Sequence, residues 1–301
     1  MKPYKADLMI LAVTMTWGSS YLFMKIGLET VSSFTLVALR FGLAFLICAA
    51  VFFRQFRTIN LVTLKYGFIL GFLLFSVSAS VILGLKTTSA SNAGFLASLT
   101  VIFIPLLSIV LFKENLNYRQ IISAFFAITG IGLLTLKDHF TINPGDLLCV
   151  LAAILYAFHI IVTGIAAKVA NTLHLGILQL GFAGGFGVLF TLIFEKPQLP
   201  ASKESWLAVL VLSIVCSAFG YILQSIAQKY TTPAHTGIIF SLEPVFAALF
   251  AYFFMNELLP LKGYLGAFLI LTGVFIAELK IKIPHHKNTI RTEVKKCSEL
   301  T

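Results

Sequence analysis

Charged side chains are scarce in this chain. Only 11% of its 301 residues are charged, whereas 58% are hydrophobic, and the mean hydropathy is +0.96. Soluble domains carry about 25% charged residues, so this composition excludes an ordinary soluble enzyme or binding module. Apolar runs of about 20 residues, enough to cross a hydrocarbon core of about 30 Å, recur along the chain. They lie near 7–26, 33–53, 65–85, 90–112, 119–137, 145–166, 175–194, 205–227, 235–255 and 261–280. We therefore expect an all-α membrane protein with ten transmembrane helices.

Motifs for metals, nucleotides and disulfides are missing as well. The four cysteines, Cys48, Cys149, Cys216 and Cys297, show no Cys-x-x-Cys spacing, and three of them lie in apolar segments. They are typical of small packing residues rather than a disulfide framework or a metal site. No Walker A sequence and no metalloprotease His-Glu pattern occurs. We expect no catalytic residue, no metal and no cofactor, and the connecting loops are too short to hold a soluble catalytic domain.

One unit of the sequence is used twice. Residues 86–137 match residues 229–280 without a gap, with fifteen identities in fifty-two positions at an offset of 143. The front of each half matches more faintly at an offset of 139, as in Asp7-Leu8 against Asp146-Leu147. We predict a first five-helix repeat at 7–137, a second at 145–280, and a basic tail at 281–301. An internal repeat in a membrane protein indicates a transporter with its site between the halves.

Lys and Arg residues are distributed unevenly between the two sides of the predicted bundle. With the N-terminus in the cytoplasm, fifteen of the 22 basic residues fall inside and five outside. Cytoplasmic loops of membrane proteins are rich in Lys and Arg, so both termini are predicted to be cytoplasmic. Five helices per repeat is an odd number, which makes the second repeat inverted. The net charge of +10 thus indicates orientation in a multi-pass plasma-membrane protein, and we expect no nucleic-acid partner.

Polar stripes follow one face of two predicted helices. Ser217, Tyr221, Gln224 and Gln228 recur at i, i+4, i+7 and i+11, and Tyr156, His159 and Thr163 at i, i+3 and i+7. Such stripes form interhelical hydrogen bonds in some proteins and line substrate cavities in others. We predict the second role. The expected substrate-binding residues here are Tyr156, His159, Ser217, Tyr221 and Gln224.

Two further helices carry smaller patterns. Ser76, Ser80 and Gly84 share one face in the third segment, and Trp17, Tyr21 and Lys25 share one in the first. Trp17, Tyr21 and Ser80 are predicted to bind substrate, and Lys25 either carries charge to the site or snorkels to the outer surface. Close helix packing is expected at the small-xxx-small spacings Gly67/Gly71 and Gly181/Gly185.

Two ionisable residues lie deep within apolar segments. Charges at such depth are expensive and mark functional candidates. Arg40 requires a carboxylate partner or an anionic substrate group. Glu243 is expected near mid-membrane and is predicted to bind substrate. Pro244 beside it frees the carbonyl of Phe240 and kinks the helix. Two interpretations of Glu243 stay open, a proton-coupling carboxyl group with Arg40 as counter-charge, and a structural kink in which Arg40 or a hydroxyl caps Glu243.

Several motifs together carry a family resemblance. They are Trp17-Gly18-Ser19-Ser20 with Lys25, Leu39-Arg40-Phe41, Ser241-Leu242-Glu243-Pro244-Val245-Phe246 running to Asn256-Glu257, and Gly266 with Leu271-Thr272-Gly273-Val274. Over residues 7–280 the chain resembles the EamA family of the drug/metabolite transporter superfamily. The resemblance implies two inverted five-helix repeats that export small metabolites, amino acids or drug-like compounds. It also implies a central cavity lined mainly by the first, third and fourth helices of each half. The first repeat departs from the pattern, because Thr100-Val101 stands where the second has Glu243-Pro244.

The function that fits these features is secondary transport of a small amphipathic metabolite, most simply its export by alternating access. The expected partners are a small-molecule substrate, the lipid bilayer and a coupling proton. The alternative is an intramembrane enzyme acting on a lipid-linked substrate, for which His159 and Glu243 are the deep acid and base candidates. Convergence of the polar residues on one central cavity would favour transport.

Overall fold

The described part of the chain is helical throughout. A computed structural model describes residues 3–54, 59–112, 118–135, 143–231, 233–240, 242–256 and 258–278, and no β-strand occurs among them. The first half contains α1 (Pro3–Gly27), α2 (Ser33–Val51), α3 (Leu61–Gly84), α4 (Ala90–Ala97), α5 (Thr100–Phe112) and α6 (Tyr118–Thr135). The second half contains α7 (Pro144–Val169), α8 (Thr172–Phe194), α9 (Lys203–Val211), the π-helical η2 (Leu212–Phe219), α10 (Gly220–Gln228), α11 (Pro233–Phe240), α12 (Glu243–Met255) and α13 (Leu261–Glu278). The tail 281–301, and with it Cys297, lies outside the described residues, as do Glu114, Ser241 and Glu257.

Each of the ten segments expected from the sequence contains one or more of these helices. Seven helical stretches among the described residues are long and apolar enough to cross a membrane, and two shorter apolar helices accompany them. Polar residues begin several of them. The side chains of Asn60, Ser89, Asn143, Asn171 and Ser202 each accept a hydrogen bond from a backbone N–H of the following turn, as helix N-caps do.

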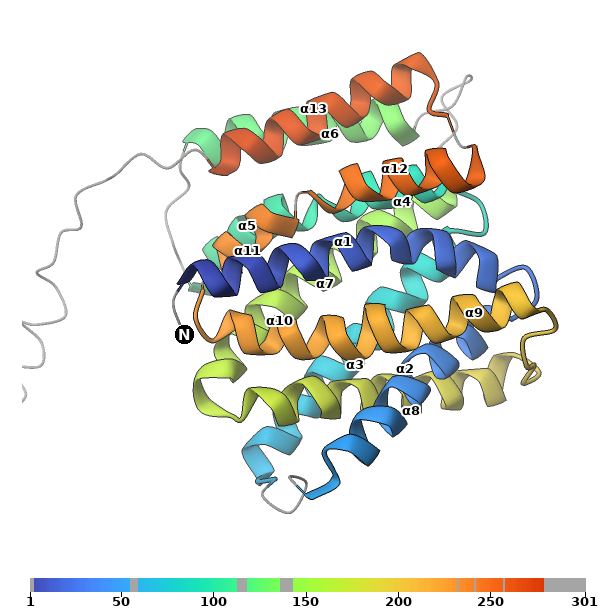
Figure 1. Cartoon of the computed structure of the whole chain (residues 1–301). Coiled ribbons are helices and arrows are strands. Elements are labelled where there is room, and N and C mark those ends of the chain that lie inside the picture. The colour runs from blue at the N-terminus through green and yellow to red at the C-terminus, as the bar shows by residue number, and fades with distance from the viewer. Residues whose placement is uncertain are drawn as a thin grey trace, which may run out of the picture.

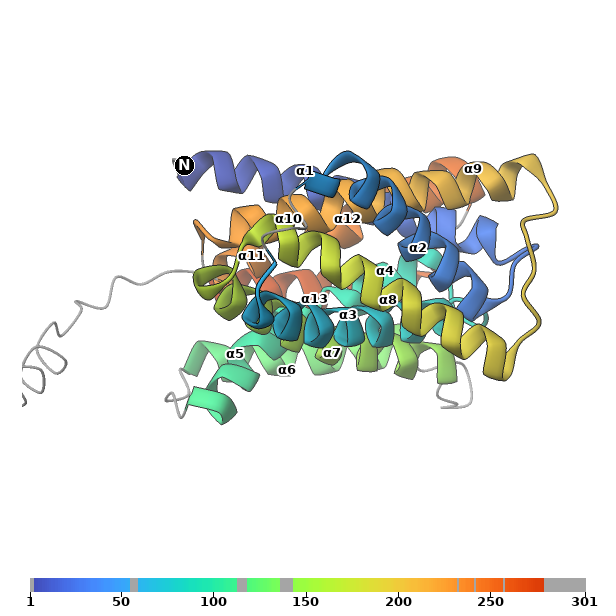
Figure 2. The same cartoon turned by 90° about the horizontal axis from the view of Figure 1, so that it is seen from below.

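The helices run roughly along one direction in both views (Figures 1 and 2). We call the end of the bundle where α1 begins the N-terminal face, and the opposite end the far face. Helices α7 and α10 end at the N-terminal face, whereas α8 and α11 begin there (Figure 1). The helices α6 and α13, which are equivalent in the two repeats, lie side by side at one edge of the bundle.

Two segments that the sequence presents as continuous helices are interrupted. The segment 90–112 divides into α4 and α5, and the segment 235–255 into α11 and α12. The breaks fall at equivalent places, since α5 begins at Thr100 and α12 begins at Glu243, and these two residues correspond in the repeat. Glu243 therefore stands in the first turn of a half-helix, with Pro244 beside it, and not within an unbroken helix. Pro suits this position, because the first turn has no intrahelical use for its missing N–H.

Close packing between α2 and α8 depends on glycine. A Cβ added to Gly184 would lie 2.7 Å from the backbone N of Gly42, and one added to Gly187 would lie 2.7 Å from the backbone N of Ala38. Gly185 is exposed, and a Cβ there would meet nothing within 4 Å. The expected packing role of Gly185 is therefore wrong. The roles of Gly67 and Gly71 are confirmed, because both would press a Cβ against α8.

Candidate functional site

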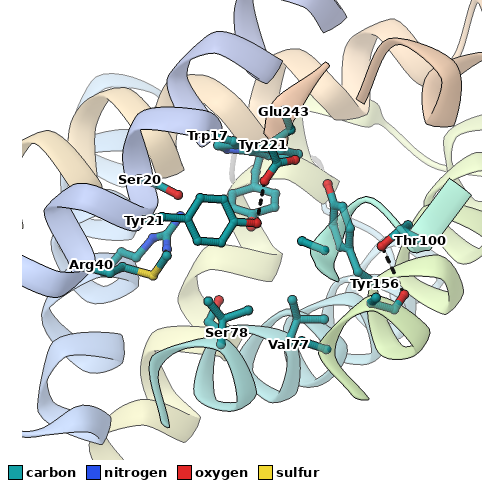
Figure 3. A pocket seen from close by; sticks show the side chains of 15 residues that line it. Trp17, Ser20, Tyr21, Arg40, Val77, Ser78, Thr100, Tyr156, Tyr221 and Glu243 are labelled. Atoms are coloured by element: carbon teal, nitrogen blue, oxygen red, sulfur yellow. Dashed lines mark hydrogen bonds between the residues drawn. The ribbon is translucent and has the colours of Figure 1, made fainter. Parts of the chain in front are cut away.

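A small pocket lies between the two repeats. Its volume is about 60 Å³, room for a few water molecules, whereas ligand pockets usually measure about 300–1,000 Å³. A molecule much larger than these waters would fit only if the helices moved apart. Side chains from both repeats line the pocket (Figure 3), namely Trp17, Ser20, Tyr21, Met24, Arg40, Val77, Ser78, Val81, Ala97, Thr100, Ala152, Ala153, Tyr156, Tyr221 and Glu243.

Glu243 presents its carboxyl group to this pocket from the break between α11 and α12. The Tyr21 hydroxyl donates a hydrogen bond of 2.7 Å to Glu243 Oε1. Both side chains are buried, so the carboxyl group has a protein partner at one oxygen. Of the two caps considered for Glu243, a hydroxyl rather than Arg40 is the one that forms.

Arg40 of α2 lines the same pocket and is 4% exposed. Its Nε–H donates to Ser217 Oγ at 2.8 Å, and Nη1 lies 3.3 Å from the sulfur of Met24. No carboxylate is among the groups bonded to Arg40 in the described part of the chain. Figure 3 shows the Tyr21 ring between Arg40 and Glu243. The pocket thus holds one basic and one acidic side chain that are not paired with each other.

Four aromatic rings form a layer beside the pocket. Trp17 lies 5.8 Å from Tyr156, 4.8 Å from Tyr221 and 5.1 Å from Phe240, measured between ring centroids. Its indole Nε1–H donates to the backbone oxygen of Cys216 at 2.7 Å. We call Trp17, Tyr156, Tyr221 and Phe240 the aromatic layer. Pocket residues such as Met24 of α1 follow Trp17 toward the far face, so the layer closes the pocket on the side of the N-terminal face.

A second polar group lies beyond the aromatic layer, one turn further along α7 and α10. His159 Nε2 and Gln179 Oε1 are 2.8 Å apart, and Gln179 Nε2 donates to Ser225 Oγ at 3.3 Å. Gln224 Nε2 lies 3.5 Å from the Tyr156 hydroxyl. The side chains of His159, Gln179, Gln224 and Ser225 are fully buried and do not line the pocket, whereas Tyr156 lines it.

The structure brings together most of the side chains expected at the site. Trp17, Tyr21, Arg40, Tyr156, Tyr221 and Glu243 line the pocket. Ser217 does not line it but holds Arg40. His159 and Gln224 lie beyond the aromatic layer, and neither Ser80 nor the half-buried Lys25 is among the lining residues.

Sequence reasoning missed Ser20, Met24, Ser78 and Thr100. Thr100 could have been found from the repeat, because it occupies the position equivalent to Glu243. In the structure its hydroxyl donates to the backbone oxygen of Ala153 at 3.1 Å. Ser78 had none, since its neighbours along the same face, Val77 and Val81, are apolar.

Comparison with known proteins places these features in a family. A model of the EamA-like transporter family matches residues 4–136 and again residues 143–279. The chain belongs to this family. An uncharacterized transporter of Archaeoglobus fulgidus is 30% identical over 93% of this chain and 88% of its own length. The uncharacterized transporter YyaM of Bacillus subtilis is 23% identical over 95% of this chain and 97% of its own. One solved crystal structure superposes with a TM-score of 0.68 at 20% identity, covering 92% of this chain and 97% of that one, which shows the shared fold.

Membership of the EamA-like transporter family, together with the apolar helices, supports a role in transport across a membrane. The enzyme alternative requires His159 and Glu243 to act on one substrate. Glu243 lines the pocket and His159 does not, so the two groups do not converge in this structure. No cluster of three His, Cys, Asp or Glu side chains suited to a metal occurs among the described residues.

Proposed function

We propose that this protein is a secondary transporter that exports small zwitterionic metabolites with an apolar body. The observation that carries the proposal is one aromatic-walled pocket that holds Arg40 and Glu243 without an ion pair between them. Arg40 presents donors suited to a carboxylate, and Glu243 and Tyr21 face the position of an ammonium group. The aromatic rings supply apolar contact and attract a cation by their faces.

The transport mechanism we propose is alternating access of two inverted five-helix repeats, 7–137 and 145–280, with ten transmembrane helices in the plasma membrane. The two separate matches of the family model support this division. So do the breaks at equivalent positions, which divide the fourth segment of each repeat. A proton that binds Glu243 is the coupling ion in this proposal.

Replacement of Arg40 by glutamine tests the substrate class. In reconstituted vesicles, a neutral amino acid with a large side chain and its carboxamide are supplied in parallel. We expect Arg40→Gln to raise the apparent KM for the carboxylate about tenfold or more, because a charge-assisted hydrogen bond contributes about 1.5–3 kcal/mol. The carboxamide should be little affected. Lys25→Gln is the matched control and should leave both values unchanged. An equal loss for both compounds would contradict the assignment of Arg40 to the carboxylate.

The proposed orientation places both termini in the cytoplasm. A thiol reagent that does not cross membranes should therefore label Cys297 only after cells are opened. The positive-inside distribution of Lys and Arg is the physical reason. Labelling of Cys297 in intact cells would show that the C-terminus is outside and contradict the proposed orientation.

A further inference from the structure

Buried polar atoms without a partner are concentrated on one side of the aromatic layer. Of seven such side-chain atoms in the described part of the chain, four are His159 Nδ1, Gln224 Oε1, Gln228 Oε1 and Thr236 Oγ1. Each of these residues is at most 1% exposed. His159, Gln224 and Gln228 follow the layer residues Tyr156 and Tyr221 toward the N-terminal face, and Thr236 precedes Phe240 from the same face. A buried polar group without a partner costs free energy, so a cluster of them indicates a surface that meets water or a ligand in another conformation.

The unpartnered atoms on α7 and α10 are hydrogen-bond acceptors. Gln228 Nε2 donates to the backbone oxygen of Ile160 at 3.5 Å, which leaves its Oε1, an acceptor, free. Gln179 uses its Nε2 to bond Ser225, so its Oε1 must accept from His159 Nε2–H. The Nδ1 atom of a neutral His159 is then also an acceptor. A ligand group that donates hydrogen bonds would satisfy these atoms.

The repeat relates this cluster to the pocket. At the offset of 139, Tyr156 corresponds to Trp17, His159 to Ser20, and Gln179 to Arg40. Ser20 and Arg40 line the pocket. Ser20 follows Trp17 along α1 toward the far face, whereas His159 follows Tyr156 along α7 toward the N-terminal face. Likewise, Arg40 lies one to two turns into α2 from the far face, and Gln179 equally far into α8 from the N-terminal face.

We propose that His159, Gln224 and Gln228 form a second substrate site, closed in this conformation, on the N-terminal side of the aromatic layer. It binds the hydrogen-bond donor end of the substrate, an ammonium, amide or hydroxyl group, when the bundle opens toward that face. The inference rests on the proposed transport function. The pocket with Arg40 and Glu243 then serves the far face and the second site serves the N-terminal face, with the rings of the aromatic layer separating them.

Thiol accessibility tests the position of the second site without any substrate. Gln228→Cys, the pocket variant Ser78→Cys and the control Ala227→Cys are each exposed to a small, charged thiol reagent from either side of the membrane. Labelling is read for each peptide by mass spectrometry, so the native cysteines can remain. We expect Gln228→Cys to react from the face opposite to that from which Ser78→Cys reacts. The fully buried Ala227→Cys should stay protected from both sides. Equal protection of Gln228→Cys and Ala227→Cys, or reaction of Gln228→Cys from the same side as Ser78→Cys, would overturn the proposal.

A second variant distinguishes a binding role from a structural one. Gln224→Leu removes an amide whose Oε1 has no partner and whose Nε2 makes only a long contact, 3.5 Å, with the Tyr156 hydroxyl. Its melting temperature should therefore stay close to that of the parent chain, while transport per folded molecule should fall at least about tenfold. A lower melting temperature with normal transport per folded molecule would make Gln224 a structural residue and contradict the proposal. Since the labelling experiment uses no substrate, a failure to find any transported compound would count against the transport function and leave the accessibility result intact.

Discussion

Replacement of Glu243 by glutamine is expected to abolish accumulation driven by a proton gradient while substrate-for-substrate exchange continues. Glutamine has nearly the shape of a protonated carboxyl group but cannot release a proton. The Tyr21 hydroxyl, which donates to Glu243 Oε1, can donate equally to the amide oxygen, so the fold around the α11–α12 break should persist. Both activities are measured in the same reconstituted vesicles, with and without an imposed pH difference.

Thr100→Val is the matched control for this experiment. Thr100 occupies the equivalent position in the first repeat and also lines the pocket, but its hydroxyl takes part in no proton transfer in the proposed mechanism. We expect the valine variant to keep gradient-driven accumulation. Full accumulation by Glu243→Gln would remove Glu243 from the coupling mechanism and leave it as part of the break before Pro244.

Substitution of Gly184 by leucine is expected to prevent folding of the bundle. The Cβ atom alone would press on the backbone of Gly42 and Phe41, and backbone atoms of a packed helix cannot move aside as a flexible side chain can. Overpacking of a core commonly costs about 1–3 kcal/mol even where side chains can yield, so a clash with backbone should cost more. The yield of monodisperse protein in detergent and its melting temperature measure the effect.

Gly185→Leu provides the control one residue away. Gly185 has the same helical environment but is exposed, with open space at its Cβ, so leucine there should reach lipid and leave yield and melting temperature close to the parent values. If Gly184→Leu and Gly185→Leu behaved alike, the close approach of α2 and α8 would not be needed for stability.

The course of the helices could be predicted from the sequence, but their breaks could not. The length of an apolar run identifies a segment that can span a membrane. It does not show where helical hydrogen bonds are lost within that segment. Pro244 signalled a kink in 235–255, whereas nothing comparable stands beside Ser98-Leu99, where the first repeat is interrupted. The π-helical η2 within 205–227 was unforeseen for the same reason.

The candidate site was predicted best where side chains are large and polar. A large polar side chain in an apolar helix must face a cavity or a polar partner. Four such residues, Tyr21, Arg40, Tyr156 and Glu243, line the pocket. Small hydroxyl residues carry less information, because serine can bond to its own helix. Ser76 does so with the backbone oxygen of Phe72 and is not at the pocket. On α3 the pocket is lined by Val77, Ser78 and Val81, and not by Ser76 or Ser80 of the stripe.

The position of Trp17 has an optical consequence. The chain contains two tryptophans. Trp17 is buried with its indole N–H bonded to Cys216, whereas Trp206 on α9 is 38% exposed. In a Trp206→Phe background, the emission spectrum would arise from the single indole that packs, tilted, against Tyr221 and Phe240. Separation of those rings would let water reach the indole and shift its fluorescence to longer wavelength. The emission of Trp17 would therefore report opening of the aromatic layer between the pocket and the proposed second site.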